Sequence, residues 1–503
     1  MRGVNKNIIR GLLLLSYIAI VILILFGISS LFSYLNTGAD RSKMLHTEIK
    51  KVDQYLPKLQ WEILNNEGRP MDEQTLNAIK NDYLDAWFVK HVAFKTNTLN
   101  GIDDYYTRNA RKNITDLVNE NSKKGISIEG TTLEHHPTLN FFSEDGQLVV
   151  LTDNNVIEYK RVYQNEAIVL ETKEKSTYKV IMLLEDGFWR IRHIIKEKTE
   201  IHKNAFTPAL INVSNIKGIN YYPQASPWDM FGDEFNVDVI SKDFKFIQNS
   251  GLNSIRVFVQ YEDFGKAKVE PEKLKKLIQV MDAAETNNLG VIVTLFDFYG
   301  DYSVLNWTLD QHHAKTIVGT LKNHKALIAW DIKNEPNLDF ESRGKENVLS
   351  WLDNMIDLVK SIDAKHPVTI GWSNVESAVL LEDKLDLITF HYYEDLDDLE
   401  EVYKALKSKT NKPVAITEFG LSSYRGIWNP FGNSENEQAD YHKQAQQIFT
   451  SNNMSFMSWT LYDFDEIPKE VVGRLPWRKQ AQGYFGFINQ KGETKPAYNY
   501  ISK

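Results

Sequence analysis

The second half of the chain alternates short apolar runs with amphipathic helical patterns. From residue 216 onward, runs of six to eleven residues rich in β-branched and aromatic side chains are separated by stretches with apolar residues at helical spacing. The runs lie at 216–222, 253–259, 290–296, 326–332, 367–372, 385–393, 412–420 and 454–464. Strand–helix alternation gives parallel strands, and eight strands predict an α/β fold of the (β/α)8 TIM barrel type over residues 216–503.

The first half has a different order of elements. Apolar residues follow helical spacing in 47–64 and 72–94, whereas short strand patterns separated by turn signals such as Glu185-Asp186-Gly187 follow Gly125. Helices followed by an antiparallel sheet predict a smaller α+β domain over 40–200, joined to the barrel by a linker at 201–215.

The N-terminus carries a long uncharged stretch. Residues 11–35 contain no charged side chain, and about 20 apolar residues suffice for a helix to cross a bilayer. No convincing cleavage site of small residues follows, so we expect residues 1–39 to form a cytoplasmic tip and an uncleaved transmembrane anchor. Arg2, Lys6 and Arg10 precede the stretch, which predicts an N-terminus in the cytoplasm and a single-pass membrane protein whose remaining mass is periplasmic or at the cell surface.

Composition narrows the possible functions. The net charge is −9 and the pI is about 5.8, so no basic surface for nucleic acid is expected. The chain has no cysteine, which excludes disulfides, thiolate metal ligands and a cysteine nucleophile. Aromatic residues make up 12% of the chain, and aromatic rings suit the faces of sugars as well as large α/β cores.

Polar and aromatic side chains stand where the predicted barrel strands end. The fourth strand ends in Asn334-Glu335-Pro336, and because proline favours extended geometry in the preceding residue, Glu335 is expected at the strand tip in an extended conformation. The other candidates are Arg256 on the second strand, His391 and Tyr393 on the sixth, Glu418 on the seventh and Trp459 on the eighth. Active sites of such barrels lie at this rim, so these groups are expected to form one site.

Two carboxylates in one site point to glycosidic bond cleavage. One carboxyl must be protonated to donate a proton to the leaving oxygen, and the other must be ionised. Arg256 is expected near Glu418, where it favours the ionised form, whereas a drier or more negative setting is expected to raise the pKa of the other carboxyl.

The motifs themselves resemble a known family. "WDIKNEP" at 330–336 and "ITEFG" at 416–420 are similar to the fourth- and seventh-strand motifs of clan A glycoside hydrolases, most like family 5, and "GINYYP" at 218–223 resembles the first strand of that group. The resemblance implies a retaining double displacement with Glu335 as acid/base and Glu418 as nucleophile. It also implies that Asn334 holds the substrate, that Arg256 and Tyr393 hydrogen-bond Glu418, that His391 lines the site and that Trp459 is the sugar platform.

Several residues allow two interpretations from sequence. Asp297, at the end of the third strand, either contacts substrate or caps a helix, and Trp228 in the first barrel loop either stacks on sugar or packs in the core. Asp463 and Trp477 on the last loop are weaker candidates for sugar contacts. His135 and His136 are adjacent on a predicted strand, so their side chains point to opposite faces and do not share a ligand.

These observations predict an enzyme that cleaves β-linked oligo- or polysaccharides at the outer face of a membrane, with no cofactor and no metal. The alternatives are a transglycosylase on envelope polysaccharide and a non-catalytic glycan-binding part of a polysaccharide export system. A metal-dependent hydrolase needs several His or Asp ligands at strand ends, where His391 stands nearly alone. The hairpin at 182–194 resembles the closing strands of the NTF2-like fold, which implies a binding or spacer role for the α+β domain.

Overall fold

The computed structural model describes residues 15–17, 19–29, 54–63, 68–202, 208–211, 213–468, 471 and 476–502. Residues 15–17 and 19–29 are helical. Within the described part of the chain, no helix combines the length and apolar character needed to cross a membrane. The predicted span at 11–35 lies partly outside these residues, as does most of the expected linker at 201–215.

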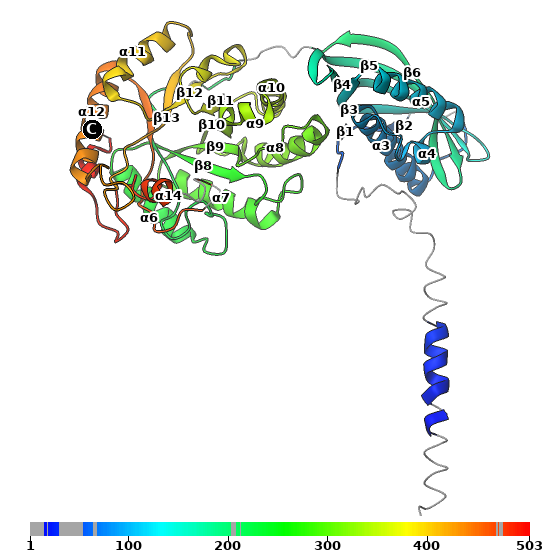
Figure 1. The fold of residues 1–503 in the computed structure, drawn as a ribbon, viewed down its shortest axis with the longest axis horizontal. Coiled ribbons are helices and arrows are strands. Elements are labelled where there is room, and N and C mark those ends of the chain that lie inside the picture. The colour runs from blue at the N-terminus through cyan, green and yellow to red at the C-terminus, as the bar shows by residue number, and fades with distance from the viewer. Residues whose placement is uncertain are drawn as a thin grey trace, which may run out of the picture.

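The predicted barrel is confirmed. Eight parallel strands close in the order β10-β11-β12-β13-β14-β7-β8-β9, so the first barrel strand pairs with the last (Figure 1). The strands are β7 (Lys217–Asn220), β8 (Ser254–Gln260), β9 (Gly290–Asp297), β10 (Leu327–Asn334), β11 (Val368–Trp372), β12 (Ile388–Tyr392), β13 (Val414–Phe419) and β14 (Ser455–Ser458). Nearly every residue of these strands is buried, because helices cover the outside and side chains fill the interior.

Helices follow the barrel strands at the predicted places. They are α6 (Val237–Asn249), α7 (Pro271–Thr286), α8 (Trp307–Leu321), α9 (Phe340–Arg343), α10 (Lys345–Ile362), α11 (Leu396–Lys407), α12 (Glu435–Asn452) and α14 (Pro476–Gln482). Sequence-local capping sets several of their starts. Asn236 accepts hydrogen bonds from the first turn of α6, and Ser434 forms a capping box with Glu437 at the start of α12.

The N-terminal domain is α+β, as predicted. Helices α3 (Glu73–Thr96), α4 (Ile102–Tyr105) and α5 (Arg108–Lys123) precede four long antiparallel strands, β3 (Ile126–Phe142), β4 (Leu148–Gln164), β5 (Ala167–Glu185) and β6 (Phe188–Ile201). The helical interpretation of 47–64 is wrong for residues 54–63. These contain strands β1 (Lys58–Leu59) and β2 (Glu62–Ile63), which pair with β3, because hydrogen bonding to a sheet edge outweighs the local apolar spacing.

His135 and His136 point to opposite faces of β3, as strand alternation predicts. His135 is fully buried, with Nδ1 2.6 Å from Oδ2 of Asp153 and Nε2 2.7 Å from the hydroxyl of Thr132. Tyr83 donates a hydrogen bond to the same Asp153 oxygen at 2.6 Å. His136 instead lies 3.2 Å from the carboxylate of Glu134. The buried histidine therefore has protein partners on both ring nitrogens.

The two domains pack against each other through β3–β5 on one side and α8 and α10 on the other (Figure 1). The rings of Tyr159 and Trp307 have centroids 4.3 Å apart, and Tyr159 belongs to the same buried cluster as the barrel core. Lys173 and Asp357 form an ion pair at 3.1 Å across this interface. The N-terminal domain is thus joined to the barrel by aromatic packing as well as by charge.

Candidate active site

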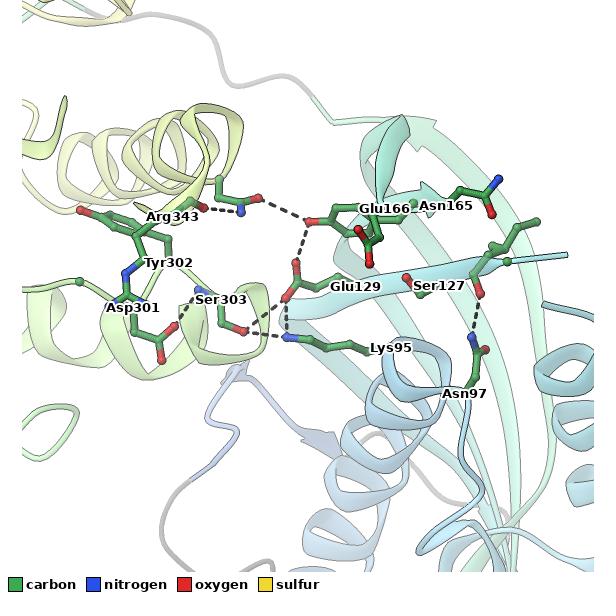
Figure 2. Close-up of a pocket in the computed structure, with 15 residues that line it drawn as sticks. Lys95, Asn97, Ser127, Glu129, Asn165, Glu166, Asp301, Tyr302, Ser303 and Arg343 are labelled. Carbon is green, nitrogen blue, oxygen red and sulfur yellow. Dashed lines mark hydrogen bonds and ion pairs between the residues drawn. The ribbon is translucent and has the colours of Figure 1, made fainter. Parts of the chain in front are cut away.

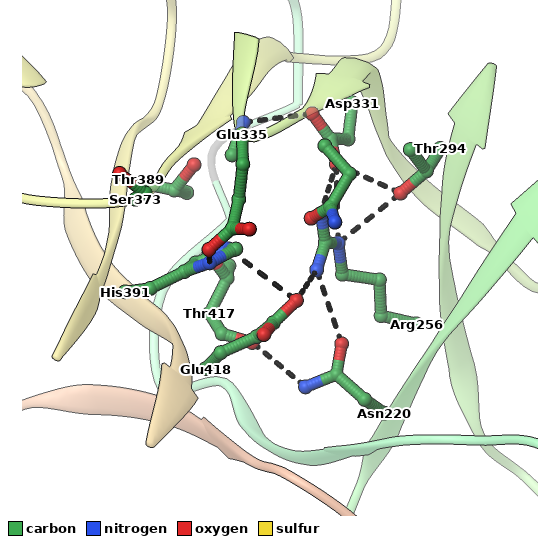
Figure 3. A network of polar contacts seen from close by, with 12 residues as sticks. Asn220, Arg256, Thr294, Asp331, Glu335, Ser373, Thr389, His391, Thr417 and Glu418 are labelled. Atoms are coloured by element: carbon green, nitrogen blue, oxygen red, sulfur yellow. Dashed lines mark hydrogen bonds and ion pairs between the residues drawn. The ribbon is translucent and has the colours of Figure 1, made fainter. Parts of the chain in front are cut away.

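Arg256 is the centre of the polar network at the carboxyl ends of the strands (Figure 3). Its side chain is fully buried on β8, and Nη1 donates to Oε1 of Glu418 at 2.7 Å. Nη2 donates to Oδ1 of Asn334 at 2.8 Å and to Oδ2 of Asp331 at 2.6 Å. The ring of Phe258, two residues along the strand, lies 4.7 Å from the guanidinium carbon. One buried cation therefore connects strands four and seven of the barrel.

Glu335 stands directly after β10, but the expectation that its backbone is extended is wrong. Its φ is 48° and its ψ is 46°, a left-handed conformation that costs about 1–3 kcal/mol in a residue with a side chain. Its N–H donates to the carbonyl of Gly371 on the neighbouring strand at 2.7 Å. A tertiary hydrogen bond and the turn into the 3-10 helix Pro336–Asp339 thus override the local preference of a residue before proline.

His391 lies between the two glutamates (Figure 3). Its Nδ1 is 2.8 Å from Oε1 of Glu335, and its Nε2 is 3.5 Å from Oε1 of Glu418. One carboxylate oxygen of Glu335 lies within 4.8 Å of one of Glu418. The side chain of Glu335 is 27% exposed and that of Glu418 is 8% exposed, so the first is the more accessible carboxylate.

Tyr393, Trp459 and Trp228 complete the wall of the site. The hydroxyl of Tyr393 donates to Oε2 of Glu418 at 3.0 Å, whereas Tyr392 points away and donates to the carbonyl of Asp395. The rings of Trp228 and Trp459 have centroids 5.9 Å apart. Both are largely buried, and Nε1 of Trp459 has no hydrogen-bond partner within the described part of the chain. Trp228 therefore packs beside the expected sugar platform.

Asp297 ends β9 inside the same site. Its side chain is 4% exposed, and Tyr222 donates a hydrogen bond to it at 3.4 Å. Burial raises the pKa of Asp297 to about 6, against the nearby positive charges of Lys333 and Arg256. Of the two interpretations from sequence, the structure supports a place beside the catalytic groups.

Two buried residues of this network were not recognised from sequence. Asp331 accepts two hydrogen bonds from Arg256, one from the hydroxyl of Thr294 at 2.7 Å and one from the N–H of Gly371 at 2.9 Å. Asn220 accepts from Nη1 of Arg256 at 3.1 Å. A signal was present, because an aspartate in the middle of an apolar strand has to be paired if it is buried.

Gly371 is required by this crowding. A Cβ at this position would lie 2.6 Å from Nη2 of Arg256 and 3.3 Å from both Oδ2 of Asp331 and Nε2 of His391. All three neighbours belong to the polar network, so none of them can move without losing a hydrogen bond.

The pKa directions of the two glutamates are opposite to those expected from sequence. Burial raises the pKa of Glu335, but the hydrogen bond and charge of His391 outweigh it and hold the pKa below its usual value. Burial raises the pKa of Glu418 above its usual value, although His391 and Arg256 act to lower it. The predicted contact between Arg256 and Glu418 is present, yet burial of Glu418 has the larger effect.

Within the described residues, Glu335, His391 and Glu418 are the only group of three His, Asp or Glu side chains close enough to hold a metal ion. Their ligand atoms already contact one another, and Arg256 and Tyr393 donate to both oxygens of Glu418. This donor set suits a buried charge network, whose cation is the guanidinium, better than a metal centre.

A closed (β/α)8 barrel with two neighbouring carboxylates at its carboxyl rim, one more exposed and one held by arginine and tyrosine, defines a glycosidase-type site. Residues 213–465 match the family model for cellulase, glycosyl hydrolase family 5. The chain belongs to this family, which confirms the resemblance seen in its strand motifs.

Curated relatives are more distant. Mannan endo-1,4-beta-mannosidase A of Emericella nidulans is 23% identical over 260 residues, covering 42% of this chain and 66% of the relative. Beta-glucuronidase of Homo sapiens is 25% identical over 279 residues, covering 51% of this chain and 40% of the relative. The chain therefore spans about two thirds or less of the length of these relatives.

Solved structures with a similar fold include a GH5_18 protein from Streptomyces cattleya in complex with GlcNAc. It has a TM-score of 0.46 and 14% identity, and the match covers 58% of this chain and 80% of that chain. Exo-beta-1,4-mannosidase Op5Man5 from Opitutaceae bacterium strain TAV5 has a TM-score of 0.46 and 16% identity, covering 59% of this chain and 58% of that chain.

Proposed function

We propose that this protein hydrolyses β-linked glycans with retention of configuration. The observation that carries the proposal is the spacing of the two carboxylates, since oxygens of Glu335 and Glu418 lie within 4.8 Å of each other. Retaining enzymes hold the two groups about 5–5.5 Å apart, whereas inverting enzymes leave about 6.5–9.5 Å for a water molecule. The spacing thus favours direct attack by a carboxylate on the sugar.

The contacts support a division of roles. Glu418 is oriented by Arg256 and Tyr393, one donor to each oxygen, which is the arrangement a nucleophile needs to present a fixed lone pair. Glu335 is the more exposed carboxylate and contacts only His391, so it can give a proton to a leaving oxygen and later accept one from water. Asn334, held by Arg256, is in place to hydrogen-bond a sugar hydroxyl.

The reaction follows from these positions. Glu418 attacks the anomeric carbon while Glu335 protonates the departing oxygen, which gives a glycosyl-enzyme ester and a free alcohol. Glu335, now ionised, then removes a proton from water, whose oxygen attacks the same carbon and releases Glu418 and a β-configured sugar. In this second step a sugar hydroxyl can replace water, which is the transglycosylation alternative.

The full-length protein in detergent micelles, incubated with aryl β-glycosides and β-linked polysaccharides, tests the proposal. Mannosides, glucuronides and glucosides come first, because the curated relatives include β-mannosidases and β-glucuronidases. We expect β-configured products by NMR, and a fall of at least about a thousandfold in kcat for Glu335→Gln and Glu418→Gln. Glu401→Gln, on the exposed face of α11, is the matched control and should keep wild-type activity.

Three results would count against it. Products of inverted configuration would exclude the covalent intermediate, and full activity in Glu418→Gln would exclude its role as nucleophile. Binding of a glycan without turnover by the wild-type protein would favour the non-catalytic alternative.

A membrane anchor at residues 11–35 is part of the same proposal. The stretch has no charged residue, and its described helical residues expose large apolar side chains such as Leu23 and Phe26. Basic residues at positions 2, 6 and 10 favour a cytoplasmic N-terminus. The catalytic domain then faces outward, where it can reach glycans of the cell envelope.

Cysteine labelling tests this placement, because the chain has no cysteine of its own. Lys124→Cys, on the exposed end of α5, should react with a membrane-impermeant maleimide on intact cells, and the protein should pellet with membranes. Labelling only after permeabilisation would place the domain inside, and recovery of the chain in the culture medium would exclude the anchor.

A further inference from the structure

A pocket of about 660 Å³ lies between the N-terminal domain and the barrel (Figure 2). Segment 125–129 on β3 and Tyr163 on β4 form one wall, and the loop 300–303 after β9 forms the other. Arg343 and Asn347 close it from the barrel side. Pockets of this size at domain interfaces are common ligand sites. We call it the interdomain pocket.

Part of the pocket lining holds the two domains together. Lys95 on α3 donates to Oε1 of Glu129 at 2.6 Å and to the hydroxyl of Ser303 at 3.1 Å (Figure 2). Tyr163 donates to Oε2 of Glu129 at 3.3 Å, and its hydroxyl lies 3.4 Å from Oδ1 of Asn347. These contacts join α3, β3 and β4 to the barrel loops, so the base of the pocket is organised before any ligand binds.

Other polar groups at the pocket have no partner within the described chain. The Arg343 guanidinium, the Ser127 hydroxyl and the side chains of Asn165 and Glu166 make no hydrogen bond or ion pair to described residues. Oδ1 of Asn97 is buried and also without a partner. Such groups need water or a ligand with both donors and acceptors.

The charges select the kind of ligand. Lys95 and Arg343 are opposed by Glu129, Glu166 and Asp301, so the pocket has no excess of positive charge for an anionic glycan. Its unpartnered groups are one guanidinium, one carboxylate, amides and a hydroxyl, which together can pair with neighbouring sugar hydroxyls as donors and as acceptors. This composition fits a neutral, hydroxyl-rich saccharide.

The pocket is continuous in sequence with the active site. The loop 300–303 begins three residues after Asp297, and Phe298 between them is 44% exposed with a φ of 55°. The hydroxyl of Tyr302 hydrogen-bonds Asp339, which also pairs with Lys333 beside the site at 3.4 Å. The two loops that bound the pocket are therefore tied to each other and to the ends of β9 and β10.

We propose that the interdomain pocket binds a sugar residue of a neutral glycan chain whose other end occupies the active site. The N-terminal domain then contributes to substrate recognition, and the exposed ring of Phe298 lies on the path between the two sites. This inference rests on the proposed glycoside hydrolase function. It predicts that chain length matters, because only a long chain reaches both sites.

The test uses the full-length protein in detergent micelles with Glu335→Gln to prevent turnover. Calorimetry measures binding of β-1,4-linked manno- and cello-oligosaccharides from disaccharide to hexasaccharide. In this background Arg343→Gln should weaken hexasaccharide binding about tenfold and leave disaccharide binding unchanged. Ser127→Tyr, which fills the pocket, should do the same. Arg108→Gln, an exposed arginine without described partners, is the matched control and should bind like its parent.

The outcomes separate this inference from the proposed function. Hydrolysis by wild type together with unchanged hexasaccharide affinity in Arg343→Gln and Ser127→Tyr would overturn the pocket and leave the hydrolase intact. Hexasaccharide binding that depends on Arg343, without hydrolysis by wild type, would support the pocket and overturn the hydrolase. Equal losses for both chain lengths would show that the variants disturb the active site, and the absence of any binding would overturn the pocket.

Discussion

Arg256 and Asp331 form a fully buried ion pair in which Nε and Nη2 of the arginine donate to the same carboxylate oxygen, at 3.1 and 2.6 Å. The remaining terminal nitrogen of the arginine faces Glu418. One positive charge is therefore shared by two carboxylates, and Asp331 fixes the plane in which the guanidinium meets the nucleophile. The orientation of Glu418 depends on a residue that does not touch it.

Replacing Asp331 tests this dependence. Asp331→Asn keeps the shape but removes one of the two negative charges on Arg256, so the arginine acts more strongly on Glu418 and lowers its pKa. We expect the acid limb of kcat/KM to move to lower pH and kcat to fall about tenfold to a hundredfold through misplacement of Arg256. An unchanged acid limb together with a lowered melting temperature would show that Asp331 only stabilises the barrel.

His391 controls both limbs of the pH profile. It lowers the pKa of Glu335 and that of Glu418, because it contacts both carboxylates. His391→Gln keeps a polar side chain but removes the imidazole, so both limbs of the bell-shaped kcat/KM profile should move to higher pH. The apparent pKa values belong to the pair, so the shift of the whole profile is what is measured. Movement of one limb alone, or toward acid, would contradict this.

Asp463 is a structural residue in this structure, not the sugar contact considered from sequence. It is 2% exposed and pairs with Lys495 at 2.9 Å, and burial raises its pKa to about 6. Lys495→Met leaves this carboxylate buried without its cation, which should cost about 3–5 kcal/mol in urea unfolding. Asp463→Asn in the same chain should recover part of the loss, and a loss below about 1 kcal/mol in the single variant would contradict the assignment.

Asp310 predicts a pH dependence of stability. Burial raises its pKa to about 7, although Tyr299 and Trp351 donate hydrogen bonds that lower it. The folded chain therefore keeps a proton that the unfolded chain has lost, and stability from this group falls as the pH rises from about 4 to about 7.

Asp310→Asn cannot lose that proton. The difference in unfolding free energy between wild type and variant should change by roughly 2–4 kcal/mol in favour of the variant between pH 4.5 and pH 8. Parallel curves over this range would show that Asp310 titrates normally in the folded protein.

Much of the site is predictable because parallel strands share a direction. Once eight strand–helix units are recognised, the carboxyl ends of all strands meet at one rim, and Arg256, Glu335, His391 and Glu418 have to converge. The alternation of side chains along a strand likewise separates Tyr392 from Tyr393, and His135 from His136. These conclusions need only local pattern and the closure of the sheet.

Contacts between residues distant in sequence decided the rest. The hydrogen bond from Glu335 to Gly371 places Glu335 in a left-handed conformation that the following proline alone would disfavour. Pairing with β3 makes strands of residues that have helical spacing. Likewise, the sharing of Arg256 between Asp331 and Glu418 joins three strands of the barrel.

The amino-acid sequence by itself determined the barrel, the family and the glutamates at the ends of strands four and seven. Only the tertiary structure decided the pKa directions of these glutamates, the positioning role of Asp331 and the pocket between the two domains. The physical reason is that strand and helix patterns are set by neighbours along the chain, whereas burial, charge and close packing are set by neighbours in space.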